Sequence, residues 1–165
     1  MGWRTRICSG AAILAVGACS VSADLESAKA AVAEYRALLK TGNGAAPYAA
    51  ADESFRDASS IETTKQLTAL YERLEDVCDP APREPVGWNV NHSPSGSFVT
   101  LSYLRTCKTG QLSETYTLKR SGDVVRVAGF NVNGPPVLAL LAPAPAETAA
   151  AQETPAPELP VQPSN

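Results

Sequence analysis

Residues 96–130 read GSFVTLSYLRTCKTGQLSETYTLKRSGDVVRVAGF, and this stretch decides the fold. Apolar and polar residues alternate along it, and the turn signals Thr109-Gly110 and Ser121-Gly122 divide it. A similar alternation at 86–90 precedes it. The pattern predicts four antiparallel strands in a meander, with one apolar face that other elements must cover.

Two-residue turns at these signals predict a register for the sheet. The first turn places Arg105 opposite Glu114 and Tyr103 opposite Tyr116. The second places Leu118 opposite Val125, or two residues further along on the same face. The large side chains expected on the outer, uncovered face are Phe98, Leu104 and Phe130.

The chain before the sheet has the periodicity of helices. Apolar residues recur at helical spacing over 25–39, which predicts a first helix that stops before Gly42. Pro47 opens a short second helix that includes Phe55, and the capping-box spacing at 59–62 opens a third helix. About three N-terminal helices on one face of a four-stranded sheet make an α+β domain.

The segments 97–103 and 114–118, and above all Arg126-Val127-Ala128-Gly129-Phe130, carry a family resemblance. Residues 24–133 resemble small exported bacterial proteins of unknown function that have the nuclear transport factor two-like (cystatin-like), cone-shaped fold. The resemblance implies a curved sheet with a cavity, and it implies no established reaction.

The N-terminus has the three-part layout of a secretory signal. Two arginines lie within residues 1–6, an apolar run follows at 7–18, and a short polar stretch ends at Ala23. Twelve apolar residues are too few to span a bilayer as a helix. We therefore expect export of the mature protein.

Two cleavage sites remain open. Residues 16–19 resemble a bacterial lipobox, so that 1–18 would be the signal and Cys19 the lipidated first residue of a membrane-anchored envelope protein on the periplasmic side. Val21-Ser22-Ala23 also fits ordinary signal peptidase, which would remove 1–23 and release a soluble periplasmic or secreted protein.

The cysteines fit an exported protein. Cys8 lies in the signal and Cys19 is lipidated or removed, so Cys78 and Cys107 remain in an oxidising compartment. We predict a disulfide between them. A redox-active pair would need a C-x-x-C spacing, which the sequence lacks.

The domain is expected to span 24–134, followed by a Pro/Ala-rich tail at 135–165 that is predicted to be disordered. A short apolar run in this tail either packs back on the domain or docks a partner. The candidate docking residues are Val137, Leu138, Leu140 and Leu141.

Charge excludes one class of partner. The expected domain has 12 Lys and Arg against 14 Asp and Glu, spread without a basic stripe. Nucleic-acid-binding proteins concentrate positive charge, so we expect no nucleic-acid partner.

The strand register predicts one polar group on the covered face. Arg105 and Glu114 would form the floor of a ligand pocket, with hydroxyls from Tyr103 and Tyr116 and with Asn131 near the rim. The alternative is an ion pair at the open end of the sheet that contributes little.

No catalytic set is visible in the sequence. His92 is the only histidine and lies in a turn, where a solvated role is expected, and no metal-ligand spacing surrounds it. We therefore expect neither a cofactor nor a metal.

The sequence favours a non-enzymatic binding or assembly module of a bacterial cell envelope. The alternatives are a soluble periplasmic small-molecule carrier or enzyme, and an accessory subunit of an envelope complex. A weak homodimer that forms through the outer face of the sheet is a further alternative.

Overall fold

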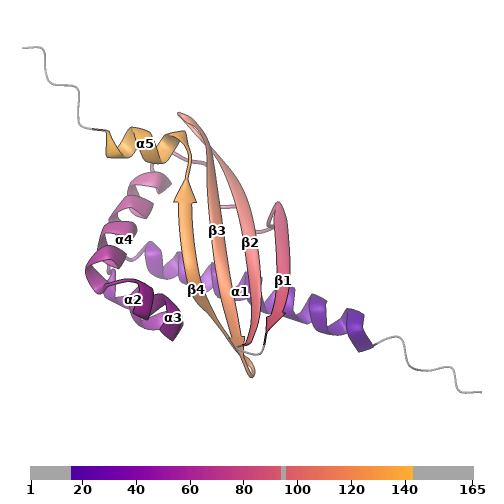
Figure 1. Ribbon diagram of the computed structural model, residues 1–165. Helices are drawn as coiled ribbons and strands as arrows, with labels where there is room; N and C mark the ends of the chain where they lie inside the picture. The colour runs from indigo at the N-terminus through magenta and orange to yellow at the C-terminus, as the bar shows by residue number, and fades with distance from the viewer. Residues whose placement is uncertain (1–15, 94–95, 143–165) are drawn as a thin grey trace, which may run out of the picture.

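The computed structural model of the chain describes residues 16–93 and 96–142 (Figure 1). Four helices come first: α1 (Val16–Leu39), α2 (Ala45–Ala50), α3 (Glu53–Ala58) and α4 (Ile61–Glu75). The strands β1 (Gly87–Ser93), β2 (Gly96–Cys107), β3 (Gly110–Ser121) and β4 (Val124–Asn133) form one antiparallel sheet in the order β1-β2-β3-β4. Helix α5 (Pro135–Leu141) follows. The predicted α+β class and the meander are confirmed.

Helix α1 covers one face of the sheet, and α2, α3 and α4 lie beside β4 (Figure 1). The buried stripe of α1 consists of Ala28, Val32, Tyr35 and Leu39, which recur at intervals of four, three and four residues. This stripe packs against the apolar residues of β2, β3 and β4. Among the helices that the structure describes, none lies over the opposite face of the sheet (Figure 1).

The segment expected as one second helix is two short helices, α2 and α3. The break falls at Asp52, whose backbone N–H donates to the carbonyl of Val127 on β4 at 2.8 Å. The Asp52 side chain then accepts from the backbone N–H of Ser54 at 3.0 Å, which caps α3. A residue that bonds the sheet edge and starts a new helix cannot continue the first one.

The N-terminus of α4 is capped by Ser60, one residue later than the capping-box spacing suggested. The Ser60 hydroxyl accepts from the backbone N–H of Thr63 at 3.0 Å. This helix buries Thr64 and Thr68 because their hydroxyls donate back to carbonyls one turn earlier.

The register of β2 and β3 is shifted by two residues from the predicted one. Cys107 pairs with Gly110, so the turn is Lys108-Thr109 rather than Thr109-Gly110. Tyr103 is therefore opposite Glu114 and Arg105 is opposite Leu112. Because a two-residue shift keeps every side chain on its face, Arg105 and Glu114 still share the covered face.

A β-bulge in β4 overturns the prediction for Phe130. Leu118 pairs with Val127 but Thr117 pairs with Gly129, so Ala128 is an extra residue. Beyond the bulge the strand has changed face, and Phe130 turns to the covered side. Its ring stacks on Tyr116 with centroids 4.5 Å apart, instead of lying on the outer face.

A disulfide joins Cys78 and Cys107, as predicted. It ties the segment after α4 to the end of β2, across a separation of 29 residues. In the chain-entropy model, closing a loop of this size stabilises the fold by about 3.5 kcal/mol.

The folded part continues past the expected boundary at Gly134, because α5 packs on the domain. Val137 is buried beside Leu74 and Leu112, and Leu140 packs against the same cluster. Arg73 on α4 donates to the carbonyl of Leu140 at 2.7 Å, which fixes the end of α5. The rest of the expected tail, 143–165, lies outside the described residues.

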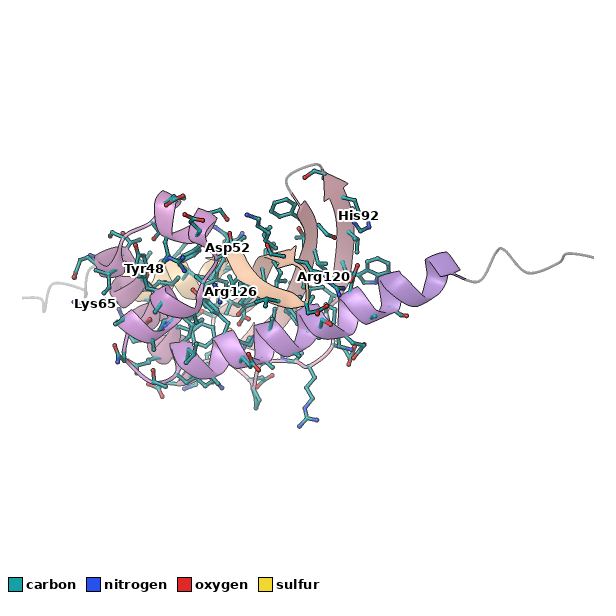
Figure 2. All side chains as sticks on the ribbon, turned by 90° about the horizontal axis from the view of Figure 1, so that it is seen from below. Tyr48, Asp52, Lys65, His92, Arg120 and Arg126 are labelled. Carbon is teal, nitrogen blue, oxygen red and sulfur yellow. A yellow bond between two sulfur atoms is a disulfide. The ribbon has the colours of Figure 1, made fainter. Side chains whose placement is uncertain are left out.

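Helix α1 begins nine residues before the expected Leu25, and its first turns extend past β1 (Figures 1 and 2). The helix joins the domain at Asp24, which is buried and pairs with Arg120 of β3. Residues 1–15 of the expected export segment lie outside the described residues, and so does the side chain of Cys19.

Candidate functional site

The polar group on the covered face centres on Glu114 of β3, which has no exposed surface. Both of its carboxylate oxygens are engaged. Oε2 accepts from Arg36 Nη2 at 2.7 Å and from the Tyr116 hydroxyl at 3.0 Å, and Oε1 accepts from Arg105 Nη1 at 3.1 Å. One carboxylate thus lies between two guanidinium groups, one from the helix layer and one from the sheet.

Arg105 of β2 reaches beyond Glu114 to the segment after α4. Its Nε and Nη2 donate to the carbonyl of Asp79 at 3.0 and 2.7 Å, and its Nη1 lies 2.7 Å from Oε1 of Glu75. The side chain has no exposed surface, so these bonds satisfy a guanidinium that water cannot reach.

Arg36 of α1, in the helix layer, also bonds both Glu114 and a backbone carbonyl of the segment after α4. Its Nη1 donates to the carbonyl of Pro82 at 2.8 Å, and its Nε lies 3.2 Å from the Tyr116 hydroxyl. The guanidinium also stacks over the ring of Tyr103, 4.1 Å from its centre. Arg36 and Arg105 together hold residues 79–82 against the domain.

Burial and charge shift the titration of the groups around Glu114. Burial raises the pKa of Tyr116 well above its usual range, and the neighbouring Glu114 charge adds to this. Burial raises the pKa of Tyr71 to about 12. Burial alone would raise the pKa of Glu75, but its hydrogen bonds and ion pairs with Lys40 and Arg105 outweigh this and lower it.

The structure brings together four of the five residues predicted for a pocket. Tyr103, Arg105, Glu114 and Tyr116 are all buried in one network. Asn131 is not part of it, because its side chain is exposed and accepts from Asn133 at 3.3 Å.

Sequence reasoning missed the helical members of the network, Arg36 and Glu75. A signal for Arg36 was present, because it lies on the buried stripe of α1, four residues after Val32 and three before Leu39. Glu75 likewise follows Tyr71 by four residues on α4. A charged residue on an apolar stripe needs a buried partner.

A groove of about 690 Å³ borders this network, between α1 and residues 80–84. One wall is Ala30, Ala33 and Ala37 of α1, and the other is Pro80-Ala81-Pro82. Arg36 and Tyr103 line the groove between these walls.

The remaining candidate residues lie elsewhere. His92 is exposed near the end of the β1–β2 hairpin, where its Nδ1 lies 2.9 Å from the Ser97 hydroxyl (Figure 2). Of the candidate docking residues, Leu138 and Leu141 are 71% and 64% exposed, whereas Val137 and Leu140 face the domain.

Within residues 16–93 and 96–142, no three His, Cys, Asp or Glu side chains are placed to hold a metal ion. In the same residues, no helix is both long and apolar enough to cross a membrane.

Comparisons of the chain with protein-family models, curated proteins and solved structures found no match. The resemblance to nuclear transport factor two-like proteins stays a prediction.

Proposed function

We propose that this protein is an exported, non-enzymatic binding or assembly module of a bacterial cell envelope, anchored to the membrane by lipid on Cys19. The charged N-terminal residues, the apolar run and the lipobox-like residues 16–19 support export and anchoring. The disulfide between Cys78 and Cys107 favours an oxidising compartment.

The complete pairing of Glu114 carries the non-enzymatic part of this proposal. A catalytic carboxylate needs an open position from which it can reach a substrate. Both oxygens of Glu114 are bonded to Arg36, Arg105 and Tyr116, and none of these four residues is more than 8% exposed. The polar groups on the covered face therefore support the fold, and the outer surfaces are left for binding.

Intact mass of the protein purified from the envelope fraction tests the anchoring. We expect a chain that begins at Cys19 and carries acyl groups. Cys19→Ala should abolish the acylated species, and the variant protein should be lost from the membrane fraction. Cys8→Ala is the matched control within the expected export segment and should behave as the wild type. An unmodified chain that begins at Asp24 would contradict the proposal.

The exposed side chains of α5 favour a second candidate, an accessory subunit of an envelope complex. Leu138 and Leu141 lie on the exposed face of α5, and the other face of this helix packs against the domain. Leu138→Ser/Leu141→Ser should reduce the size of the detergent-extracted complex. The control is Ile61→Ser, because Ile61 is also exposed, at 44%, but lies at the start of α4. An unchanged complex in the α5 variant would count against this candidate.

A further inference from the structure

We propose that residues 143–165 of this chain, through the proline-rich run 155–160, occupy the groove between α1 and residues 80–84. This inference goes beyond the proposed function and does not depend on the lipid anchor.

The walls of the groove suit an extended chain. Alanines from α1 and the Pro80-Ala81-Pro82 segment carry short side chains, so another backbone can approach both walls closely. The lining residues of this wall run from Glu26 on α1 to Lys40 directly after it, which corresponds to about 21 Å along the helix axis. A polyproline II segment covers that length with about seven residues.

The polar groups of the groove offer hydrogen-bond donors. Tyr103 is 1% exposed, and among the described residues its hydroxyl has no hydrogen-bond partner. Arg83 on the rim is exposed and has no ion-pair partner in the part of the chain that the structure describes. The carbonyl of Pro82 is already used by Arg36. The groove therefore favours an occupant that supplies acceptors.

Residues 143–165 have this chemistry. They include six prolines and three glutamates, and no lysine or arginine. Proline lacks a backbone N–H, so a proline-rich segment presents more backbone carbonyl acceptors than N–H donors. The run Pro155-Ala156-Pro157-Glu158-Leu159-Pro160 adds a carboxylate for the rim. Proline-rich segments also lose little conformational entropy on binding.

The end of α5 places this segment within reach. Leu140 is bonded to Arg73 on α4, and Glu75 on the same helix pairs with Lys40 at one end of the groove, at 2.5 Å. The 23 residues that follow Ala142 span up to about 70 Å as polyproline II. Twelve of them separate Ala142 from Pro155, which is enough chain to enter the groove from the Lys40 end.

Photo-crosslinking of the full chain tests the occupant. A benzophenone amino acid at position 159, irradiated and mapped by mass spectrometry, should crosslink within the chain to residues 29–40 or 80–84. Tyr103→Phe removes only the hydroxyl and should lower this yield about fivefold, the effect of one hydrogen bond. Arg83→Gln, an exposed change that leaves the core intact, should also lower it.

Tyr35→Phe is the matched control, because the Tyr35 hydroxyl is also buried without a partner in the described residues but does not line the groove. Its crosslinking yield should equal that of the wild type. An equal mixture of ¹⁴N and ¹⁵N protein separates crosslinks within one chain from those between chains. Crosslinks between chains, crosslinks spread over other surfaces, or a wild-type yield in both Tyr103→Phe and Arg83→Gln would each overturn the proposal.

Discussion

The guanidinium carbon of Arg36 lies 4.1 Å from the centre of the Tyr103 ring, so a cation from the helix layer covers an aromatic side chain of the sheet. A cation held over an aromatic ring away from water is worth about 2 kcal/mol. The same guanidinium bonds Glu114 and the carbonyl of Pro82. Arg36 therefore links three parts of the molecule at one point.

Removal of the Glu114 charge should destabilise the protein strongly. Glu114→Gln keeps the side-chain volume but leaves Arg36 and Arg105 buried without their shared carboxylate. We expect a loss of about 3–5 kcal/mol in the free energy of unfolding, measured by urea denaturation. The control is Glu84→Gln, which removes an exposed, solvent-screened pair with Lys29 and should lower the free energy of unfolding far less. Equal losses in the two variants would contradict the role of the network.

Glu75 should make stability depend on pH in the acid range. Burial opposes the charge of Glu75, but hydrogen bonds and ion pairs with Lys40 and Arg105 win, so its pKa in the folded protein lies below its value in the unfolded chain. Its stabilising effect is present above the unfolded pKa and is lost as the pH falls through the folded pKa. The difference in unfolding free energy between wild type and Glu75→Gln should therefore shrink from about pH 6 to about pH 3. A constant difference over this range would count against the ion pairs.

Two buried tyrosines should make the protein less stable in alkali. Burial raises the pKa of Tyr35 and Tyr71 from 10.0 to about 12 in the folded protein. A raised pKa gives stability that is complete below the unfolded value and lost as the pH rises toward the folded one. The unfolding free energy should fall by roughly 2 kcal/mol per tyrosine between pH 10 and 12. Tyr35→Phe and Tyr71→Phe should each flatten this slope, and an unchanged slope in both would disprove the assignment.

The bulge in β4 predicts opposite outcomes for two large apolar residues of the sheet. Phe130 contacts the rings of Tyr116, Tyr71 and Tyr35, so Phe130→Ala should cost about 3 kcal/mol. Leu104 is 42% exposed on the outer face, and Leu104→Ala should cost less than about 1 kcal/mol. Thermal or urea unfolding measures both losses. A larger loss of unfolding free energy in Leu104→Ala than in Phe130→Ala would show that Phe130 faces outward.

The disulfide should contribute a measurable share of stability. Cys78→Ala/Cys107→Ala removes the bond that closes the loop between α4 and the end of β2. We expect a loss of about 3.5 kcal/mol in the free energy of unfolding under oxidising conditions. Under reducing conditions the variant and the wild type should converge, and a difference that persists there would point to strain from the substitution.

Most of the fold could be predicted because its signals are local. The alternation in β2 and β3 identifies the covered face, and the two-residue errors in register left that face unchanged. The bulge shifts β4 by one residue, and no apolar pattern encodes such a shift. Gly129 within a strand was the only sign of it, and glycine marks many other features of strands as well.

The site could be predicted only where it lies on strands. Arg105 and Glu114 interrupt an alternating pattern, so their side chains could be assigned to the covered face. Arg36 was overlooked because a helix stripe was defined by its apolar members alone. That Arg36 meets Glu114, 78 residues away, depends on the position of α1 over the sheet, which local periodicity does not determine.

The pairing of Arg36 with Glu114 also fixes the alignment of the two layers. Apolar stripes alone allow a helix to slide along a sheet at small cost, because one aliphatic contact replaces another. If α1 moved by one turn, about 5.4 Å, so that Val32 replaced Arg36 beside Glu114, the buried carboxylate would lose one of its two guanidinium partners. The Glu114 carboxylate therefore favours one position of α1 along the sheet and makes sliding of the helix against the sheet costly.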